Sequence, residues 1–366
     1  MKVGIIGLPN VGKSTLFNAI TNMNVLEANY PFATIQPNVG VASVDDERLH
    51  FLAKLFQSQK VVKTQIQFID IAGLVKNASK GEGLGNKFLG NIRDVDAICH
   101  VVKCFENPNI MHVNEKVNPT EESDIIETEL ILSDLEQIEK RLAKLNKQKK
   151  SLKEQEFLEE SELLNKIKIS LENNTISSIN LNSHESKIIK NFNLLSLKPM
   201  IYICNFQEKD LLNLKDNLFF QQMKLYSESQ NRKIIPVCIL LEKEISILSE
   251  EEQQNFLKIY NLKQNALQEI IQSSYNLLGL QTFFTAGKTE TKAWSFLKNM
   301  TAPECGRIIH SDFERGFIKV EVCNYEDLFQ FQSVAKAKEN GKIRLEGKNY
   351  LVQDGDIIIF HFNVTK

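Results

Sequence analysis

The chain has 366 residues and a formal net charge of −2. This length exceeds one average domain, so two or three compact units are expected. The near-neutral charge argues against a protein that coats nucleic acid by bulk electrostatics, although local basic patches are compatible with it. No apolar run approaches the roughly 18 to 20 residues of a membrane span, so we expect no membrane partner.

The six cysteines are predicted to be buried free thiols. Their spacing does not resemble that of a zinc site, and most of them lie in or beside apolar, strand-like runs. Free thiols persist in a reducing compartment, and the N-terminus leads into a strand pattern without the features of a signal peptide. We therefore expect a cytoplasmic protein with unpaired Cys99, Cys104, Cys204, Cys238, Cys305 and Cys323.

The first motif is the stretch from Gly7 to Thr15, which reads GLPNVGKST. Two glycines separated by four residues and followed by Lys and Ser predict a phosphate loop, between a strand at 3–6 and a helix beginning at 15. Backbone N–H groups and the helix N-terminus then point at a polyphosphate. Lys13 is expected to reach the outer phosphates, and the Ser14 hydroxyl to bind Mg²⁺.

Two later segments complete the pattern of a nucleotide switch. The proline-containing loop 29–38 carries Thr34, at a place where a P-loop switch enzyme puts its second Mg²⁺ ligand. Asp70 ends a strand predicted over 65–71 and is followed by Gly73. In this arrangement Asp70 holds a Mg²⁺-bound water, and the Gly73 N–H faces the terminal phosphate.

The residue that orients the attacking water is not the usual one. Many GTPases have a Gln directly after the glycine that corresponds to Gly73. Here Leu74 occupies that position, and an aliphatic side chain cannot orient a water molecule. His112 is the candidate, because it follows a strand predicted over 97–104 at the sheet edge where ligands bind. The alternative is a surface-loop histidine. His100, inside that strand, is predicted to be a hydrogen-bonded core histidine.

Residues 121–198 predict an inserted helical arm. Apolar residues recur with helical spacing in two series, as expected for an antiparallel hairpin. Basic residues, among them Lys147, Lys149 and Lys150, precede a run of glutamates. They form either two solvated faces that pair with each other or a basic tip that contacts RNA phosphates. The two apolar series are Ile131, Leu135, Ile138, Leu142 and Leu145, then Phe157, Leu164, Ile167 and Leu171.

A strand predicted over 199–204 ends in Asn205, Phe206, Gln207 and Glu208. GTPases carry Asn-Lys-x-Asp here, and the Asp accepts two hydrogen bonds from guanine. The extra methylene of Glu208 displaces the carboxylate, and each unpaired donor costs roughly 1 to 3 kcal/mol. Adenine lacks the 2-amino group, so ATP is the predicted ligand. A strand at 234–237 follows, and Ile239 and Leu240 then replace part of the usual Ser-Ala-Lys loop.

The tail from 280 onward changes to short strands and glycine turns. It contains no catalytic constellation and is predicted to be a binding module or a domain that packs on the first. Its strands are predicted at Thr282–Thr285, Arg307–His310, Gly316–Val322 and Gly355–Phe362.

Together these strings resemble the Obg-like ATPases of the YchF subfamily, a branch of the translation-factor P-loop GTPases. The likeness covers nearly the whole chain and includes GLPNVGKST at 7–15, NYPFATIQPN at 29–38 and FIDIAGLVKNASKGEGLGNKFL at 68–89. It continues in HVVKCFEN at 100–107, in the N-x-x-E string at 205–208, and in QTFFTAGKTETKAW and HSDFERGFI in the tail.

The resemblance implies an α/β fold: a P-loop NTPase G-domain with a mainly parallel sheet at 1–120 and 199–279, an inserted antiparallel helical hairpin at 121–198, and a ubiquitin-like TGS domain at 280–366. It also implies residue roles. Asn10, Val11, Gly12, Lys13, Ser14 and Thr15 bind the phosphates, Ser14 and Thr34 bind Mg²⁺, the Phe206 backbone reads adenine beside Asn205 and Glu208, and Asn10 coordinates a K⁺.

The expected function is an Mg²⁺-dependent ATPase switch that binds the ribosome or its large subunit, through the arm and the TGS domain. Two alternatives stay open at this stage. One is a ribosome- or RNA-binding protein in which hydrolysis is incidental, and the other is a true GTPase.

Overall fold

A computed structural model describes residues 1–25, 38–71, 84–107, 116–148, 154–248, 250–259 and 265–363. The chain forms two compact units, Met1–Gly40 with Gln67–Ile270 and Val41–Ile66 with Ile271–Lys366. This division differs from the expected boundaries, because residues 41–66 group with the tail rather than with the nucleotide-binding part. The reason is strand pairing: β3 (Lys60–Val62) runs parallel to β9 (Glu290–Leu297).

The first unit is built on a six-stranded sheet of order β2-β4-β1-β5-β6-β7. Its central pairs, β1 with β4 and β5, β5 with β6, and β6 with β7, are all parallel. β2 and β4 run from one unit into the other. The strands are β1 (Lys2–Ile6), β2 (Val39–Val44), β4 (Thr64–Asp70), β5 (Ala97–Lys103), β6 (Met200–Asn205) and β7 (Ile234–Val237).

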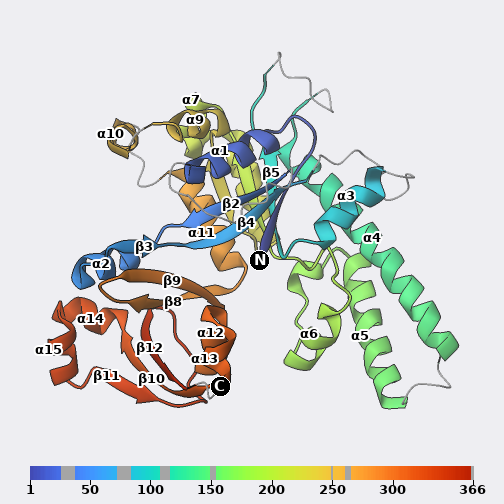
Figure 1. The fold of residues 1–366 in the computed structure, drawn as a ribbon. Helices are drawn as coiled ribbons and strands as arrows, with labels where there is room; N and C mark the ends of the chain where they lie inside the picture. Colours follow the sequence, from blue (N-terminus) through green and yellow to red (C-terminus); the bar gives the residue numbers. More distant parts are fainter. Residues whose placement is uncertain are drawn as a thin grey trace. The chain divides into compact units, whose positions relative to one another are not determined.

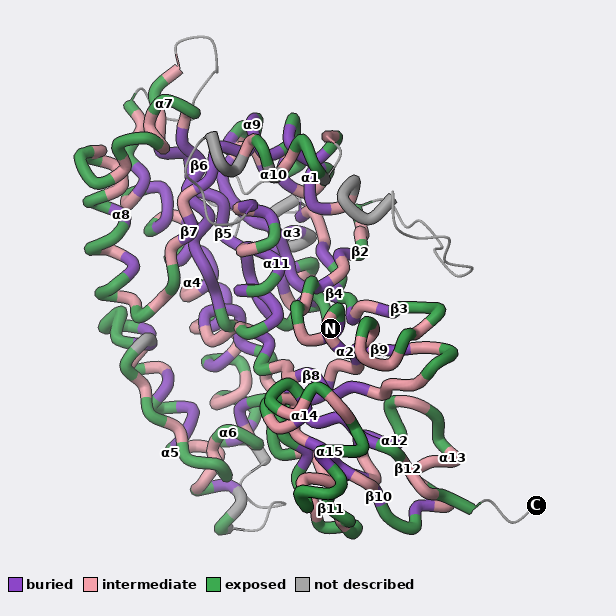
Figure 2. Tube along the Cα trace, turned by 90° about the vertical axis from the view of Figure 1, so that its left-hand side faces the viewer, coloured by how far each residue is buried: buried purple, intermediate pink, exposed green. Residues whose placement is uncertain are grey.

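Burial explains why continuous apolar runs in the sequence predict these strands. Every residue of β5 and β6 is buried, and Figure 2 shows the buried residues following these strands through the middle of the unit. Parallel strands covered on both faces need apolar side chains on both. The helices of this unit are α1 (Lys13–Val25), α3 (Leu84–Arg93), α7 (Glu208–Leu211), α8 (Leu218–Ser229), α9 (Ile239–Ile245) and α10 (Glu250–Ile259), with a 3-10 turn η2 (Leu214–Asp216).

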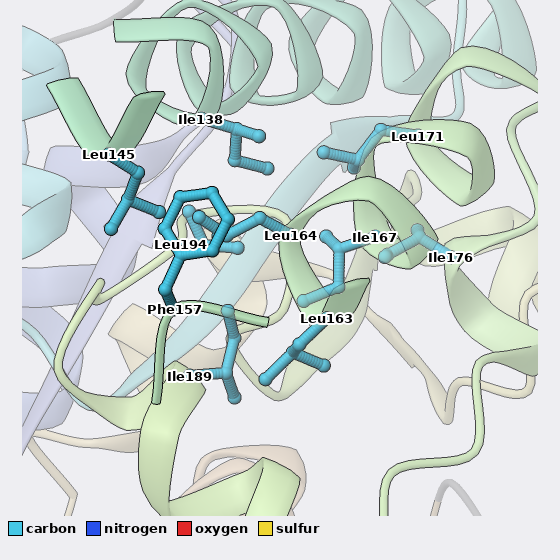
Figure 3. Close-up of a cluster of buried hydrophobic side chains, with 10 residues drawn as sticks. All are labelled: Ile138, Leu145, Phe157, Leu163, Leu164, Ile167, Leu171, Ile176, Ile189 and Leu194. Atoms are coloured by element: carbon cyan, nitrogen blue, oxygen red, sulfur yellow. The ribbon is translucent and has the colours of Figure 1, made fainter. Parts of the chain in front are cut away.

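The predicted arm is present as α4 (Pro119–Gln148) and α5 (Glu154–Glu172), followed by η1 (Ile176–Ser178) and α6 (Ser183–Lys190). Figure 1 shows α4 and α5 side by side with α6 beside them. Buried apolar side chains of these elements point toward one another (Figure 3). Both predicted series are confirmed, because all of their members belong to this cluster: Ile138, Leu145, Phe157, Leu164, Ile167 and Leu171 are buried, and Ile131, Leu135 and Leu142 pack against them.

The second unit has its own sheet of order β11-β10-β12-β8-β9-β3. One face packs on α12 and α13, and the other packs on α2, α14 and α15. Helix α11 (Ala266–Leu277) begins in the first unit and ends in this one. The remaining elements are α2 (Glu47–Phe56), β8 (Leu280–Ala286), α12 (Ala302–Ile309), α13 (Ser311–Arg315), β10 (Phe317–Asn324), α14 (Tyr325–Phe331), α15 (Val334–Glu339), β11 (Ile343–Glu346) and β12 (Asp356–Phe362).

One predicted strand of the tail is wrong. Residues Arg307–His310 form the end of helix α12 and the residue after it. The helix starts upstream at a capping box, in which the Thr301 N–H donates to the Glu304 carboxylate over 2.7 Å, and it has a proline in its first turn. These start signals outweigh the β-branched pair near its end.

Two further sequence predictions meet the structure here. All six cysteines are buried thiols and none of them forms a disulfide, as predicted. Among the described helices, none combines the length and the apolar character that crossing a bilayer requires.

Leu164→Ala is expected to destabilise the arm strongly. Leu164 has no exposed surface and lies in the apolar cluster between the helices, so truncation leaves a cavity that costs about 2–5 kcal/mol. Urea unfolding followed by circular dichroism measures the change. Leu158→Ala is the matched control on the same helix, because Leu158 is 47% exposed and surface changes stay within about 0.5 kcal/mol. Equal losses in both variants would contradict this packing.

Candidate functional site

The phosphate loop lies between β1 and α1, at the carboxyl end of the central strand. β1 has β4 on one side and β5 on the other, which makes this edge the switch point where open α/β sheets bind ligands. Gly7 permits the close approach of two strands, because a Cβ there would lie 2.4 Å from the Val101 carbonyl oxygen. Gly12 has φ +106°, a conformation that favours glycine.

The helix that follows the loop is suited to an anion. α1 has no acidic residue in its first turn, so nothing in the helix itself competes with phosphate for its N-terminal N–H groups. The Leu16 N–H is the first to be used inside the helix, and it donates to Gly12 over 2.9 Å. Ser14 is exposed at the start of α1, and Thr15 is half-buried beside it.

Lys13 is folded back onto the loop. Its Nζ donates to the Leu8 carbonyl over 2.7 Å, and the residue is 8% exposed. Burial lowers the pKa of Lys13 to about 8, and the negative charge of Asp70 offsets part of that shift. The ammonium group and the Asp70 carboxylate therefore lie close enough to interact at this edge of the sheet, as the paired motifs predict.

Asp70 ends β4, where it lies opposite Ile5 of β1. Its Oδ1 is buried and has no hydrogen-bond partner among the described residues. A buried carboxylate oxygen without a partner is costly unless a ligand satisfies it. A Mg²⁺-bound water would supply the missing donor, so the residues present fit the metal that the two motifs predict.

Asn205 connects three parts of the site. Its Nδ2 donates to the Val11 carbonyl of the phosphate loop over 3.0 Å, and its Oδ1 accepts from the Ile239 N–H over 3.1 Å. Asn205 is 8% exposed, so both bonds are shielded from water. The last residue of β6 thereby fixes the phosphate loop and the start of α9 in one arrangement.

One of the two polar backbone groups of Phe206 is already hydrogen-bonded within the protein. Its N–H donates to the Val237 carbonyl over 2.7 Å, so only the Phe206 carbonyl can face a base. Glu208 is exposed at the beginning of α7. It lies near Cys238, whose pKa is raised mainly by burial and further by the Glu208 charge. Glu208 and the start of α9 therefore flank the same region.

Three of the predicted site residues lie outside the described part of the chain: Thr34, Gly73 and His112. Their roles remain predictions. Lys149 and Lys150, two of the lysines predicted for a basic tip, also lie outside it.

The prediction for His100 needs a correction. It is buried in β5 and its ring lies 5.6 Å from that of Tyr202, but its Nδ1 has no hydrogen-bond partner among the described residues. Burial lowers the pKa of His100 to about 3, helped by the charges of Arg232 and Lys13. The buried ring is therefore neutral and packs against Tyr202, and the predicted hydrogen bond is not made at Nδ1.

The sequence reasoning missed the groups that attach the arm to the sheet. Glu127 of α4 lies 2.7 Å from Arg232 and accepts a hydrogen bond from Tyr202 of β6. The Arg232 Nη1 also donates to the Tyr202 hydroxyl over 2.6 Å. The positions of these residues in the sequence carry no motif, so only the tertiary structure reveals the cluster.

The fold and this loop define a P-loop NTPase of the G-domain class. A family model described as a 50S ribosome-binding GTPase matches residues 2–150, and the C-terminal YchF-GTPase model, described as a protein of unknown function, matches residues 280–363. The chain is 49% identical over 365 residues to the ribosome-binding ATPase YchF of Bacillus subtilis (strain 168), covering 100% of both chains.

Two further comparisons agree. The identity is 44% over 364 residues to the ribosome-binding ATPase YchF of Escherichia coli O157:H7, with 99% of each chain covered. The solved structure of the Schizosaccharomyces pombe YchF GTPase superimposes with a TM-score of 0.90 at 36% identity, covering 99% of this chain and 97% of that one. The chain therefore belongs to the YchF family.

The affinity for a nucleoside triphosphate is expected to fall as the pH rises through about 8. The free protein loses the Lys13 proton near this pH, whereas phosphate oxygens favour the protonated lysine in the complex. Linkage then lowers the association constant by up to about tenfold per pH unit above the pKa of the free state. Calorimetric titrations between pH 7 and 9.5 measure the trend.

Lys13→Met is the control for this titration. It should bind weakly and show a flat profile over the same range, since the titrating group is gone. A steep profile in that variant would assign the proton to another group.

Proposed function

We propose that this protein is an Mg²⁺-dependent ATPase that prefers ATP to GTP and acts as a nucleotide switch on the ribosome or its large subunit. The observation that supports this proposal most is the pair of hydrogen bonds made by the Asn205 side chain. One side chain, Asn205, holds the phosphate loop to the base-reading strand end, and the N-x-x-E sequence there is unsuited to guanine.

The phosphate part of the proposal rests on the loop. The N–H groups of 10–15 and the Lys13 ammonium would hold the triphosphate. Ser14 and Thr34 would hold Mg²⁺ directly, and Asp70 would hold it through a water. The metal, when bound, neutralises charge that develops on the phosphates. Asn10, exposed in the loop with φ 64°, is the proposed K⁺ ligand.

The base part rests on hydrogen-bond chemistry. The 6-amino group of adenine is a donor, and the Phe206 carbonyl is the acceptor left at that residue, because its N–H is bound to Val237. The guanine edge needs a carboxylate placed to accept two bonds. Glu208 carries that carboxylate one methylene farther out, so both guanine donors would lose their partner.

The ribosome part rests on the family. The relatives named above are called ribosome-binding ATPases, and one matched family model is described as a 50S ribosome-binding GTPase. We propose the same partner here, contacted by the arm and by the tail, which we assign to the TGS class. A ribosomal partner also implies a cytoplasmic protein.

Glu208→Asp is expected to shift the preference toward GTP. Shortening the side chain returns the carboxylate to the position that accepts both guanine donors, and each recovered bond is worth about 1–3 kcal/mol, so the GTP-to-ATP affinity ratio should rise by about tenfold or more. Competition of unlabelled GTP and ATP against a fluorescent ATP analogue measures the ratio.

The control for this exchange is Glu228→Asp, the same substitution at an exposed position of α8, which should leave the ratio unchanged. Tighter binding of GTP than of ATP by the unmodified protein would refute the adenine assignment and restore the GTPase alternative.

His112→Ala is expected to slow hydrolysis and to leave ATP affinity unchanged. We propose that His112 orients the attacking water, because Leu74 cannot, and loss of such a group typically costs about 10²–10⁴-fold in rate. Single-turnover hydrolysis at saturating protein measures the step. A variant with an unaltered rate would remove His112 from the mechanism while leaving the nucleotide site intact.

A further inference from the structure

The end of helix α3 is fastened to the arm by a group of five residues, which we call the α3 clasp: Arg93, Ser133, Gln137, Asn193 and Lys198. α3 is the helix that follows the Asp70-to-Gly73 motif along the chain, and Arg93 is its last residue. Ser133 and Gln137 belong to α4 of the arm, whereas Asn193 and Lys198 belong to the connector that returns from the arm to β6.

The side chain of Arg93 holds α4. Its Nη2 donates to the Ser133 hydroxyl over 3.1 Å, and its Nη1 donates to the Gln137 amide oxygen. Ser133 and Gln137 are four residues apart and so lie on one face of the helix. The Gln137 amide nitrogen in turn donates to the Phe192 carbonyl over 2.6 Å. The Arg93 guanidinium thus joins α3 to the arm, and the Gln137 amide joins the arm to its returning connector.

The backbone at the end of α3 is held from the other side. The Asn193 Nδ2 donates to the Arg93 carbonyl over 2.7 Å, and the Lys198 Nζ donates to the Val95 carbonyl over 2.6 Å. The Lys198 Nζ also lies 2.6 Å from the Asn193 Oδ1. Carbonyls at a helix C-terminus have no partner within the helix, and here side chains of the connector satisfy them.

The same turn of α4 is anchored to the chain that enters the nucleotide site. Asp134 is fully buried and accepts hydrogen bonds from the backbone of Leu195 over 3.0 Å and of Ser196 over 2.8 Å. These residues lead into β6, which ends at Asn205. The middle of α4 is therefore bound both to the helix after the Mg²⁺ motif and to the connector that leads into β6.

We infer that the α3 clasp transmits the nucleotide state to the arm, with Arg93 as the positioning residue that makes the link. A shift of α3 between nucleotide states moves Ser133 and Gln137 with it, because breaking the two hydrogen bonds of the Arg93 guanidinium would leave partly buried polar groups unpaired. The inference rests on the proposed nucleotide switch for the existence of two states, and it adds the route by which the arm responds.

Hydrogen exchange on the full-length protein tests the route. Backbone exchange is compared between Mg²⁺ with a non-hydrolysable ATP analogue and Mg²⁺ with ADP, in peptides covering α3 and in peptides covering α4. In the unmodified protein both sets should change, by about fivefold or more in rate if the coupling has the usual size. In Arg93→Ala the α3 peptides should still change, and the difference in α4 should fall to less than about twofold.

Arg141→Ala is the matched control. This substitution also removes an arginine that hydrogen-bonds to a neighbouring element. The partner of Arg141, however, is Glu160 within the arm, at 2.6 Å, so the nucleotide response of α4 should persist. Gln137→Ala removes the partner of Arg93 on the arm, and it is measured in place of Arg93→Ala if that variant does not fold. It should weaken the response of α4 in the same direction.

The outcomes separate the two ideas. A nucleotide response of α4 that survives both Arg93→Ala and Gln137→Ala overturns the inference, as does an unmodified protein in which α3 responds and α4 does not. Both of those results leave the nucleotide switch standing. Failure of ATP and ADP to bind at all, measured by calorimetry on the same samples, overturns the proposed function and the inference together.

Discussion

The position of Asn205 is the constraint on which the rest of the nucleotide site depends. A phosphate loop must hold its backbone open toward a ligand, and such a loop has few internal contacts of its own. Here the loop is held by a hydrogen bond from outside, from the Asn205 amide to the Val11 carbonyl. The same amide accepts from Ile239. Because one planar group serves both, any movement of the loop relative to the end of β6 or the start of α9 breaks a buried bond.

The sheet around this residue makes the arrangement rigid. The Cys104 N–H donates to the Asn205 carbonyl over 2.8 Å, which ties the end of β6 to the end of β5. Gly7 allows β1 to approach Val101 of β5 in turn. The ligand-binding edge therefore consists of three strand ends in register, and preorganised donors of this kind need no rearrangement when charge arrives.

The motifs and the buried strands could be predicted from the sequence, and the long-range polar contacts could not. β5 and β6 were readable because apolar runs bounded by loops have one simple interpretation, and Asn205 was readable because its string follows a strand. Arg93 gives no such signal, since its partners lie some forty residues away on a helix whose register is set by the apolar cluster. The grouping of 41–66 with the tail depends likewise on pairing with a strand far along the chain. The strand prediction at Arg307–His310 is wrong for a local reason, because the capping box at Thr301 starts a helix that continues through the two adjacent isoleucines.

Lys13 shows how the site limits the cost of binding. A lysine on the surface loses considerable side-chain freedom when it grips a phosphate. This one is already confined, with its ammonium on the Leu8 carbonyl and Asp70 nearby, so little additional order is lost when a triphosphate enters. In the proposed complex the bond to the neutral Leu8 carbonyl would be exchanged for one to phosphate, in which donor and acceptor are both charged. Burial acts in the opposite direction, since it lowers the pKa of the group that must be charged. The folded protein thus keeps the lysine ordered at the expense of its protonation, and the entering phosphate, by restoring a full countercharge, removes that penalty at the moment of binding.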